Sequence, residues 1–262
     1  MIFLENSIVL NTNHLKDRLM GSALLVLLLM NTPVIANIDD DIDQDDGSTG
    51  SEFPHIPEPM VFDLVRPLGV TQGELEINTL AQYETQGNSV EWAPEIEYAI
   101  RDGLAIELEL PFYNATLEDY KFAIQDTLPD HSHHFTHGWQ MIGRYSRHES
   151  SYSADMLYIA GYRFNARWST LNMLGIRNED IGKHASLEGL ANFTFFYTLN
   201  ENMALGIETN SAFTRNRWDF SFWPQLHANF TDRLSLQMGA GYRNLQIQTS
   251  GIVITSRLIY TF

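Results

Sequence analysis

The residues best suited to chemistry are glutamates that recur at every second position in two neighbouring segments. Glu91, Glu95 and Glu97 lie in the first segment, and Glu107 and Glu109 lie in the second. Paired carboxylates can act as general acid and base, and they can also attract cations in a watery passage. Solvated carboxylates are common, and no nucleophile motif accompanies these, so we predict no catalytic residue and no enzyme.

Histidines form a second candidate site, in the sequence DHSHHFTH. Imidazoles at this spacing can bind zinc or copper. We favour a solvated turn over a metal site, because the strand count below places these residues at a turn. The weak metal candidates are His131, His133, His134 and His137. We therefore predict no cofactor.

Two predicted strands position the glutamates. Ser89–Ile100 and Leu104–Tyr113 alternate apolar and polar residues with a period of two, which is typical of strands with one apolar and one polar face. Arg101-Asp102-Gly103 predicts a tight turn between them, because glycine readily adopts a positive φ. A soluble sheet would bury the apolar face, whereas a membrane barrel would turn it toward lipid and keep the polar face around its lumen.

The composition narrows the class of protein. The chain has 262 residues, no cysteine and a net charge of −17. Disulfides and thiolate metal sites are excluded, and the negative charge argues against nucleic acid as a partner.

The N-terminal region predicts export. The apolar run Leu19–Met30 is too short to span a bilayer as a helix, follows Lys16 and Arg18, and precedes Val34-Ile35-Ala36. This pattern predicts a signal peptide over residues 1–36, with a buried core helix as the alternative. Residues 37–72 form an acidic linker and lead-in segment, and its Asp-rich part does not have the spacing of a calcium loop. Residues 73–262 form the predicted barrel.

Alternation along the rest of the chain predicts about twelve antiparallel strands. With the N-terminus in the periplasm, every second connection should be a short turn, and most of those connections are tight and rich in Asn, Asp or Gly. The predicted strands are about Glu74–Glu84, Ser89–Ile100, Leu104–Tyr113, Asp119–Leu128, His134–Arg147, Tyr152–Phe164, Arg167–Ile176, His184–Leu199, Met203–Phe213, Arg217–Thr231, Leu234–Gln248 and Ile252–Phe262.

Aromatic residues near the strand ends favour a transmembrane barrel over a soluble sandwich. They form two groups on the apolar faces, as in the girdles of membrane barrels. The final strand carries Leu258, Tyr260 and Phe262 on one face, which resembles the assembly signal read by the barrel-assembly machinery. Pro94 and Pro224 count against the prediction, because each removes a hydrogen bond from a strand.

The polar faces supply the predicted lumen. An acidic group on the first three strands would lie between basic groups on the fourth to sixth and the last two. A water-filled acidic sector would favour cations, whereas a paired one would leave the lumen nearly closed. The predicted lumen residues are Glu76, Glu91, Glu95, Glu97, Glu107, Glu109, Lys121, Arg144, Arg163, His227, Arg243 and Arg257.

The segment FDLVRPLGVTQGELEINTL, followed by PEIEYAIRDGLAIELELP, carries a family resemblance. It resembles the opening of outer-membrane barrels often described as phenol-degradation meta-pathway or transporter-like proteins. The resemblance covers Phe62–Pro111 and implies a barrel, with no catalytic residues to carry over.

These patterns together predict a single all-β, antiparallel transmembrane barrel in the outer membrane of a Gram-negative bacterium. We expect a channel or transporter-like protein for a small solute, with outer-membrane lipid and the assembly machinery as partners. The alternatives are a structural barrel with a blocked lumen (for instance by Phe62–Gly69), a membrane-embedded hydrolase of lipid or peptide, and a soluble periplasmic sandwich.

Overall fold

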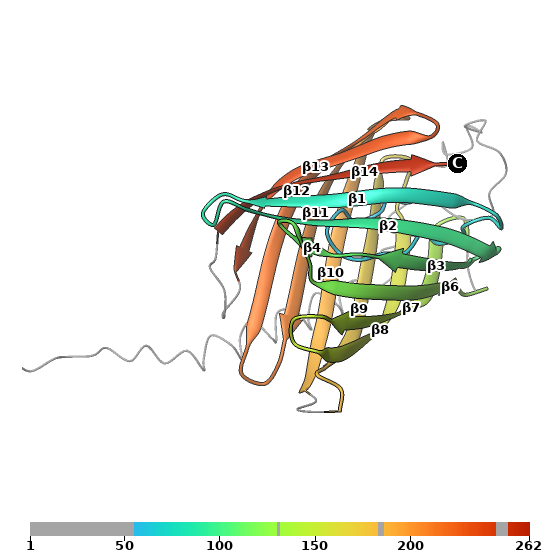
Figure 1. Ribbon diagram of the computed structural model, residues 1–262. Helices are drawn as coiled ribbons and strands as arrows, with labels where there is room; N and C mark the ends of the chain where they lie inside the picture. Colours follow the sequence, from blue (N-terminus) through green and yellow to red (C-terminus); the bar gives the residue numbers. More distant parts are fainter. Residues whose placement is uncertain (1–54, 130–131, 183–185, 245–250) are drawn as a thin grey trace, which may run out of the picture. The chain divides into compact units, whose positions relative to one another are not determined.

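The computed structural model describes residues 55–129, 132–182, 186–244 and 251–262, and they form a closed antiparallel barrel. Twelve strands make the ring, and β14 returns to pair with β1, for example Leu258 with Thr79 (Figure 1). The ring strands are β1 (Leu75–Glu84), β2 (Ser89–Arg101), β3 (Leu104–Glu109), β6 (Asp119–Thr127), β7 (Phe135–Ser146), β8 (Ser151–Arg163), β9 (Trp168–Glu179), β10 (Ser186–Asn200), β11 (Met203–Phe213), β12 (Trp218–Thr231), β13 (Leu234–Asn244) and β14 (Gly251–Thr261). The closed ring confirms the predicted all-β antiparallel barrel and excludes the alternative fold, a two-sheet sandwich.

The alternation of each strand sorts its side chains between the outside and the lumen. Large apolar residues lie on the outer surface, and Ile96, Leu108 and Phe122 are each about half exposed. An apolar band this extensive is suited to lipid rather than water. The described residues contain no helix long and apolar enough to cross a membrane.

The barrel has two rims, which we call near and far. The near rim carries the β2–β3, β8–β9, β10–β11 and β12–β13 turns, and the far rim carries the β1–β2, β7–β8 and β11–β12 turns. Gly103 in the β2–β3 turn has a φ of 77°, as the predicted turn requires.

The third predicted strand is shorter than the sequence indicates. The sequence predicts one strand over Leu104–Tyr113, but β3 ends at Glu109, and the chain then forms a small hairpin of β4 (Phe112–Tyr113) and β5 (Thr116–Leu117). Pro111 explains the break, because proline has no N–H to donate to a ladder. The hairpin stays attached to the ring through the pairing of β4 with β2.

Pro94 and Pro224 do not break their strands. Pro94 lies opposite Thr79, and its carbonyl accepts a hydrogen bond from the Leu110 N–H at 3.1 Å. Pro224 lies opposite Ile207. Each proline removes one N–H donor from its strand. The register is continuous with one neighbouring strand, β1 for Pro94 and β11 for Pro224, and skips the proline on the other side.

Candidate functional site

Residues 55–70 lie inside the barrel, and we call this segment the plug. Ile56, Met60, Leu64, Val65 and Leu68 are all buried there. The composition of the segment predicts a solvated linker as far as Glu58, whereas the side chains of Ile56 and Glu58 are buried inside the barrel. The barrel wall buries these two side chains, and the sequence of the segment alone does not show that contact.

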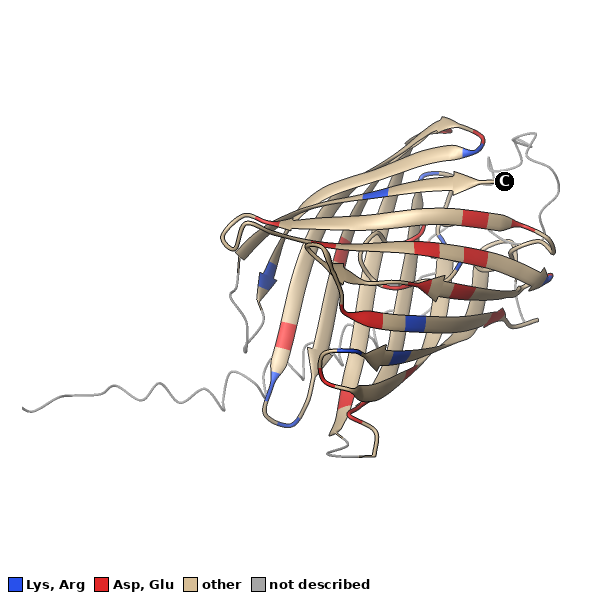
Figure 2. Ribbon diagram, viewed as in Figure 1, with Lys and Arg blue, Asp and Glu red and all other residues tan. Residues whose placement is uncertain are grey.

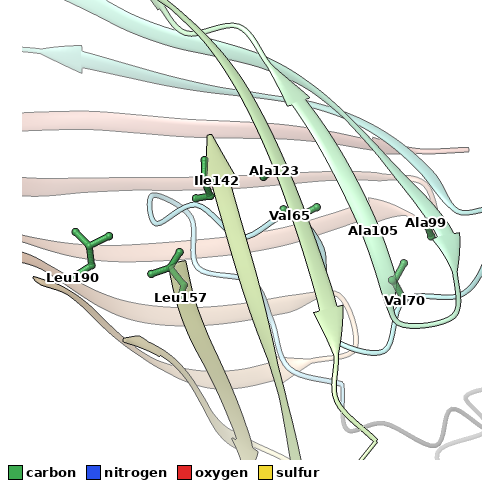
Figure 3. Packing of buried hydrophobic residues seen from close by; sticks show 8 residues of the cluster. All are labelled: Val65, Val70, Ala99, Ala105, Ala123, Ile142, Leu157 and Leu190. Carbon is green, nitrogen blue, oxygen red and sulfur yellow. The ribbon is translucent and has the colours of Figure 1, made fainter. Parts of the chain in front are cut away.

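Small wall residues let the plug approach closely. Val65 and Val70 pack with Ala99, Ala105 and Ala123 of β2, β3 and β6 in one buried cluster (Figure 3). Leu64, Leu68 and Ile56 pack in a second cluster that includes Phe196 of β10. These apolar contacts favour the docked plug.

Glu208 of β11 holds the backbone of the plug. Its carboxylate accepts hydrogen bonds from three consecutive N–H groups, those of Met60 at 2.9 Å, Val61 at 3.1 Å and Phe62 at 2.6 Å. Asn210 and Gln225 donate to the same carboxylate at 2.8 and 3.3 Å. The carboxylate is completely buried, so these donors replace the water it would otherwise bind.

Amide side chains of the wall satisfy further backbone groups of the plug. Gln140 of β7 accepts from the Val65 N–H at 3.1 Å and donates to the Asp63 carbonyl at 2.7 Å. Gln125 of β6 donates to the Arg66 carbonyl at 2.6 Å. The backbone between Met60 and Arg66 is thus bonded to wall side chains and adds no strand to the barrel.

Ion pairs complete the attachment. Arg66 contacts Glu76 and lies 2.8 Å from Glu74 and 3.8 Å from Glu97. Asp63 contacts Lys121 and lies 3.5 Å from Arg144. Burial alone would raise the pKa of Asp63, but these two cations hold it below its usual range.

Glu58 pairs with Arg257 of β14 at 3.7 Å. Burial raises the pKa of Glu58 to about 7, and the Glu76 carboxylate adds to this against the attraction of Arg257 and Arg66. The plug therefore carries both a carboxyl that stays ionised and one that titrates near neutrality.

The predicted acidic residues lie together at the lumen, and cations lie on both sides of them. Glu95 and Glu97 contact Arg257 at 3.0 and 3.4 Å, and Lys121 contacts Glu107 at 3.2 Å and also Glu109. Figure 2 shows the acidic bands of β1, β2 and β3 between basic bands on β14 and β6. Of the two arrangements predicted for the acidic group, the structure has the one in which the carboxylates pair with cations.

The other predicted lumen residues lie further from this group. Glu91 pairs with Arg243 at 3.0 Å near the far rim, and Arg144 pairs with Asp155 at 2.7 Å. The Arg163 Nε donates to the Asn165 carbonyl at 3.4 Å at the near rim. His227 is buried, and its Nε2 lies 3.0 Å from Gln225 Oε1.

The described histidines of the DHSHHFTH stretch do not converge on one point. His133 and His134 are exposed, and His134 Nδ1 lies 3.0 Å from the Arg163 carbonyl. His137 Nδ1 lies 2.8 Å from the hydroxyl of Tyr158, which is exposed on the outer surface. His131 lies outside the described residues. The groups in the described part that could hold a metal ion contain carboxylates alone.

The three predicted assembly residues lie on the outer surface of the closing strand. Leu258, Tyr260 and Phe262 are 48%, 40% and 61% exposed. The rings of Tyr260 and Phe262 pack edge to face with centroids 4.9 Å apart. Their role in assembly stays a prediction, as does the signal peptide, which lies outside the described residues.

Several charged lumen residues are missing from the sequence prediction. Glu208 shares the inward face of its strand with Ala204, Gly206 and Asn210, so extending the alternation along Met203–Phe213 would have found it. Asp155 could have been found in the same way. It joins Arg144 to Arg177, whose Nε lies 2.9 Å away.

Some of the lumen beside the plug is open. A cavity of about 230 Å³ is lined by Phe62 and Asp63 of the plug and by wall residues that include Arg144, Arg177 and Arg243. These arginines all pair with carboxylates. The cavity thus has paired charged groups set among apolar side chains such as Phe62, and the plug forms part of its wall.

Comparison with known proteins agrees with this geometry. The COG4313 outer membrane channel from Pseudomonas putida F1 superposes with a TM-score of 0.60 at 12% identity, covering 77% of this chain and 100% of that one. The NanC porin gives 0.58 at 11%, covering 71% and 98%. A KdgM porin in complex with disordered oligogalacturonate gives 0.55 at 9%, covering 72% and 99%. The chain therefore shares the barrel fold of these outer-membrane proteins.

The sequence comparisons are less specific. A family described as HAEPLYID-like matches residues 53–129, which include the plug and the first strands. No curated protein matches the chain. The findings support porin-like barrels in general, and the narrower resemblance to the phenol-degradation group stays a prediction.

Proposed function

We propose that this protein is an outer-membrane channel for a small solute, and that the plug closes it until the plug is displaced. The observation that carries the proposal is the way the plug is attached. Its backbone bonds to wall side chains, chiefly Glu208, Gln140 and Gln125. The twelve strands pair with one another around the whole ring, so the plug can leave without breaking the barrel ladder.

The opened lumen should favour cations. Displacement of the plug removes Arg66 from Glu76 and Glu97, and it removes Asp63 from Lys121 and Arg144. Glu95, Glu97 and Glu107 would then line a wetter passage, with Arg257 and Lys121 as their remaining partners. Rings of carboxylates select cations in other channels.

A structural barrel with a permanently blocked lumen is the second candidate. The apolar contacts of Leu64, Val65 and Leu68 favour it, because they hold the plug in place without any charge. A hydrolase has less support, because the buried carboxylates of Glu95 and Glu107 lie in ion pairs with Arg257 and Lys121.

The experiment is single-channel recording in a planar bilayer under a salt gradient. The full chain should be mostly closed, with brief openings whose reversal potential shows cation preference. Glu208→Ala should increase the fraction of time spent open, because three plug N–H groups lose their acceptor. A barrel that passes no current as either protein, at any applied voltage, would establish the structural alternative.

A further inference from the structure

Three buried carboxylates come together on the hairpin formed by β2 and β3. Glu95, Glu97 and Glu107 each offer one oxygen, and these oxygens all lie within 4.8 Å of one another. Their residues are 7%, 0% and 1% exposed. Glu97 lies directly opposite Glu107 in the strand register, a position in which like charges repel and destabilise a sheet.

The cations that reach this group are each shared with other carboxylates. Arg66 lies 3.8 Å from Glu97 and also pairs with Glu74 and Glu76. Arg257 is divided among Glu95, Glu97 and the plug residue Glu58. Lys121 is divided among Asp63, Glu107 and Glu109. Each cation carries one positive charge against three negative ones.

Glu107 shows the deficit most clearly. Neither oxygen of its carboxylate accepts a hydrogen bond from the described residues. Its Oε1 lies 3.2 Å from Lys121 Nζ, and its Oε2 accepts no hydrogen bond in the described part of the chain. An ionised carboxyl group buried to 1% exposure is costly in this state, and either a proton or a further cation relieves the cost.

The spacing of the oxygens fits one ion. Oxygen ligands bind Ca²⁺ at about 2.4 Å, so oxygens that all lie within 4.8 Å of one another are close enough to share one such ion. Ca²⁺ also tolerates an irregular arrangement, whereas Mg²⁺ demands near-ideal octahedral geometry. A second carboxylate group, Asp63 with Glu107 and Glu109, already holds the Lys121 ammonium.

We propose that Glu95, Glu97 and Glu107 form a binding site for a divalent cation, with Ca²⁺ as the ion that fits. The ion supplies positive charge beyond that of Arg257, Lys121 and Arg66, and each of the three glutamates contributes one carboxylate oxygen. The site lies in the barrel wall, so it does not depend on whether the barrel conducts.

The test is calorimetric titration of the purified full chain in detergent after treatment with a chelator. The wild type should bind one Ca²⁺ with a Kd of about 10⁻⁴ to 10⁻³ M, the range of extracellular calcium modules. Glu107→Gln should weaken binding by about tenfold or more, since loss of an outer partner alone has that effect. Glu91→Gln is the matched control, because Glu91 lies on β2 with Glu95 and Glu97 but pairs with Arg243. This variant should bind Ca²⁺ as the wild type does.

Two results would overturn the proposal. One is the absence of saturable Ca²⁺ binding by the wild type. The other is binding that is unchanged in Glu107→Gln, which would assign the ion to other acids, such as the aspartates of residues 39–46. If Glu107→Gln does not fold, Glu95→Gln removes a different ligand of the same site, and the same outcomes apply to it.

Discussion

Replacing Glu208 with alanine should loosen the plug and leave the barrel folded. The carboxylate accepts from the N–H groups of Met60, Val61 and Phe62 at 2.9, 3.1 and 2.6 Å. A hydrogen bond to a charged group contributes about 1.5 kcal/mol, so three contribute about 4.5 kcal/mol. At about 1.4 kcal/mol per tenfold, and with water replacing part of the loss, the docking equilibrium should shift by about 10² to 10³.

Hydrogen exchange followed by mass spectrometry measures this shift directly. Amide protection of Met60–Phe62 should fall by that factor in Glu208→Ala, while protection of the strands stays unchanged. Glu188→Ala is the control, because it removes a buried carboxylate of the adjacent strand that contacts Arg177 and Arg217. Equal amide protection of the plug in Glu208→Ala and the wild type would show that the Glu208 carboxylate does not hold the plug.

Three further predictions concern charge and assembly. Burial raises the pKa of Glu58 to about 7 from an ordinary 4.5. The carboxyl group of Glu58 therefore holds its proton more tightly in the docked plug than in the displaced plug. Docking should be strongest below about pH 4.5 and should weaken as the pH rises through about 7. Channel openings should therefore become more frequent as the pH rises from acid to neutral, and Glu58→Gln should make the opening frequency less dependent on pH. Openings that become more frequent in acid would contradict this role of Glu58. Arg66→Met leaves buried Glu76 and Glu97 without this partner and should weaken docking by about 3 kcal/mol or more, measured as plug amide exchange. Arg101→Met is the control, because it breaks an exposed pair with Asp126 and should change stability by about 1 kcal/mol or less. Equal effects of Arg66→Met and Arg101→Met would show that Arg66 does not hold the plug in place. The folded barrel should run at a different gel mobility before and after boiling, and identical mobility would argue against a closed barrel in the membrane.

Strands were the part of the fold that the sequence could predict. Alternation is a local property, so Arg217–Thr231 predicts β12 (Trp218–Thr231) to within one residue, and Met203–Phe213 matches β11. The same logic fails at Leu104–Tyr113, where Pro111 ends the pairing although the apolar pattern continues.

The plug could not be predicted in the same way. Its residues have no strand or helix period, and its main contact joins Met60 to Glu208, which is 148 residues away in the chain. Sequence reasoning kept Phe62–Gly69 only as one way to block the lumen. The acidic sector was easier, because alternation alone places Glu95, Glu97 and Glu107 on one face, but which cation pairs with which carboxylate depends on strand register and on the plug.

The central claim, that the plug closes an otherwise open barrel, is tested most directly by deleting residues 55–70. Single-channel conductance of the deletion should be compared with that of the full chain in the same bilayer, after gel mobility shows that both barrels are folded. We expect a mostly closed full chain and a steadily open, cation-selective deletion. A folded deletion that passes no current, or a full chain that conducts equally well, would contradict it.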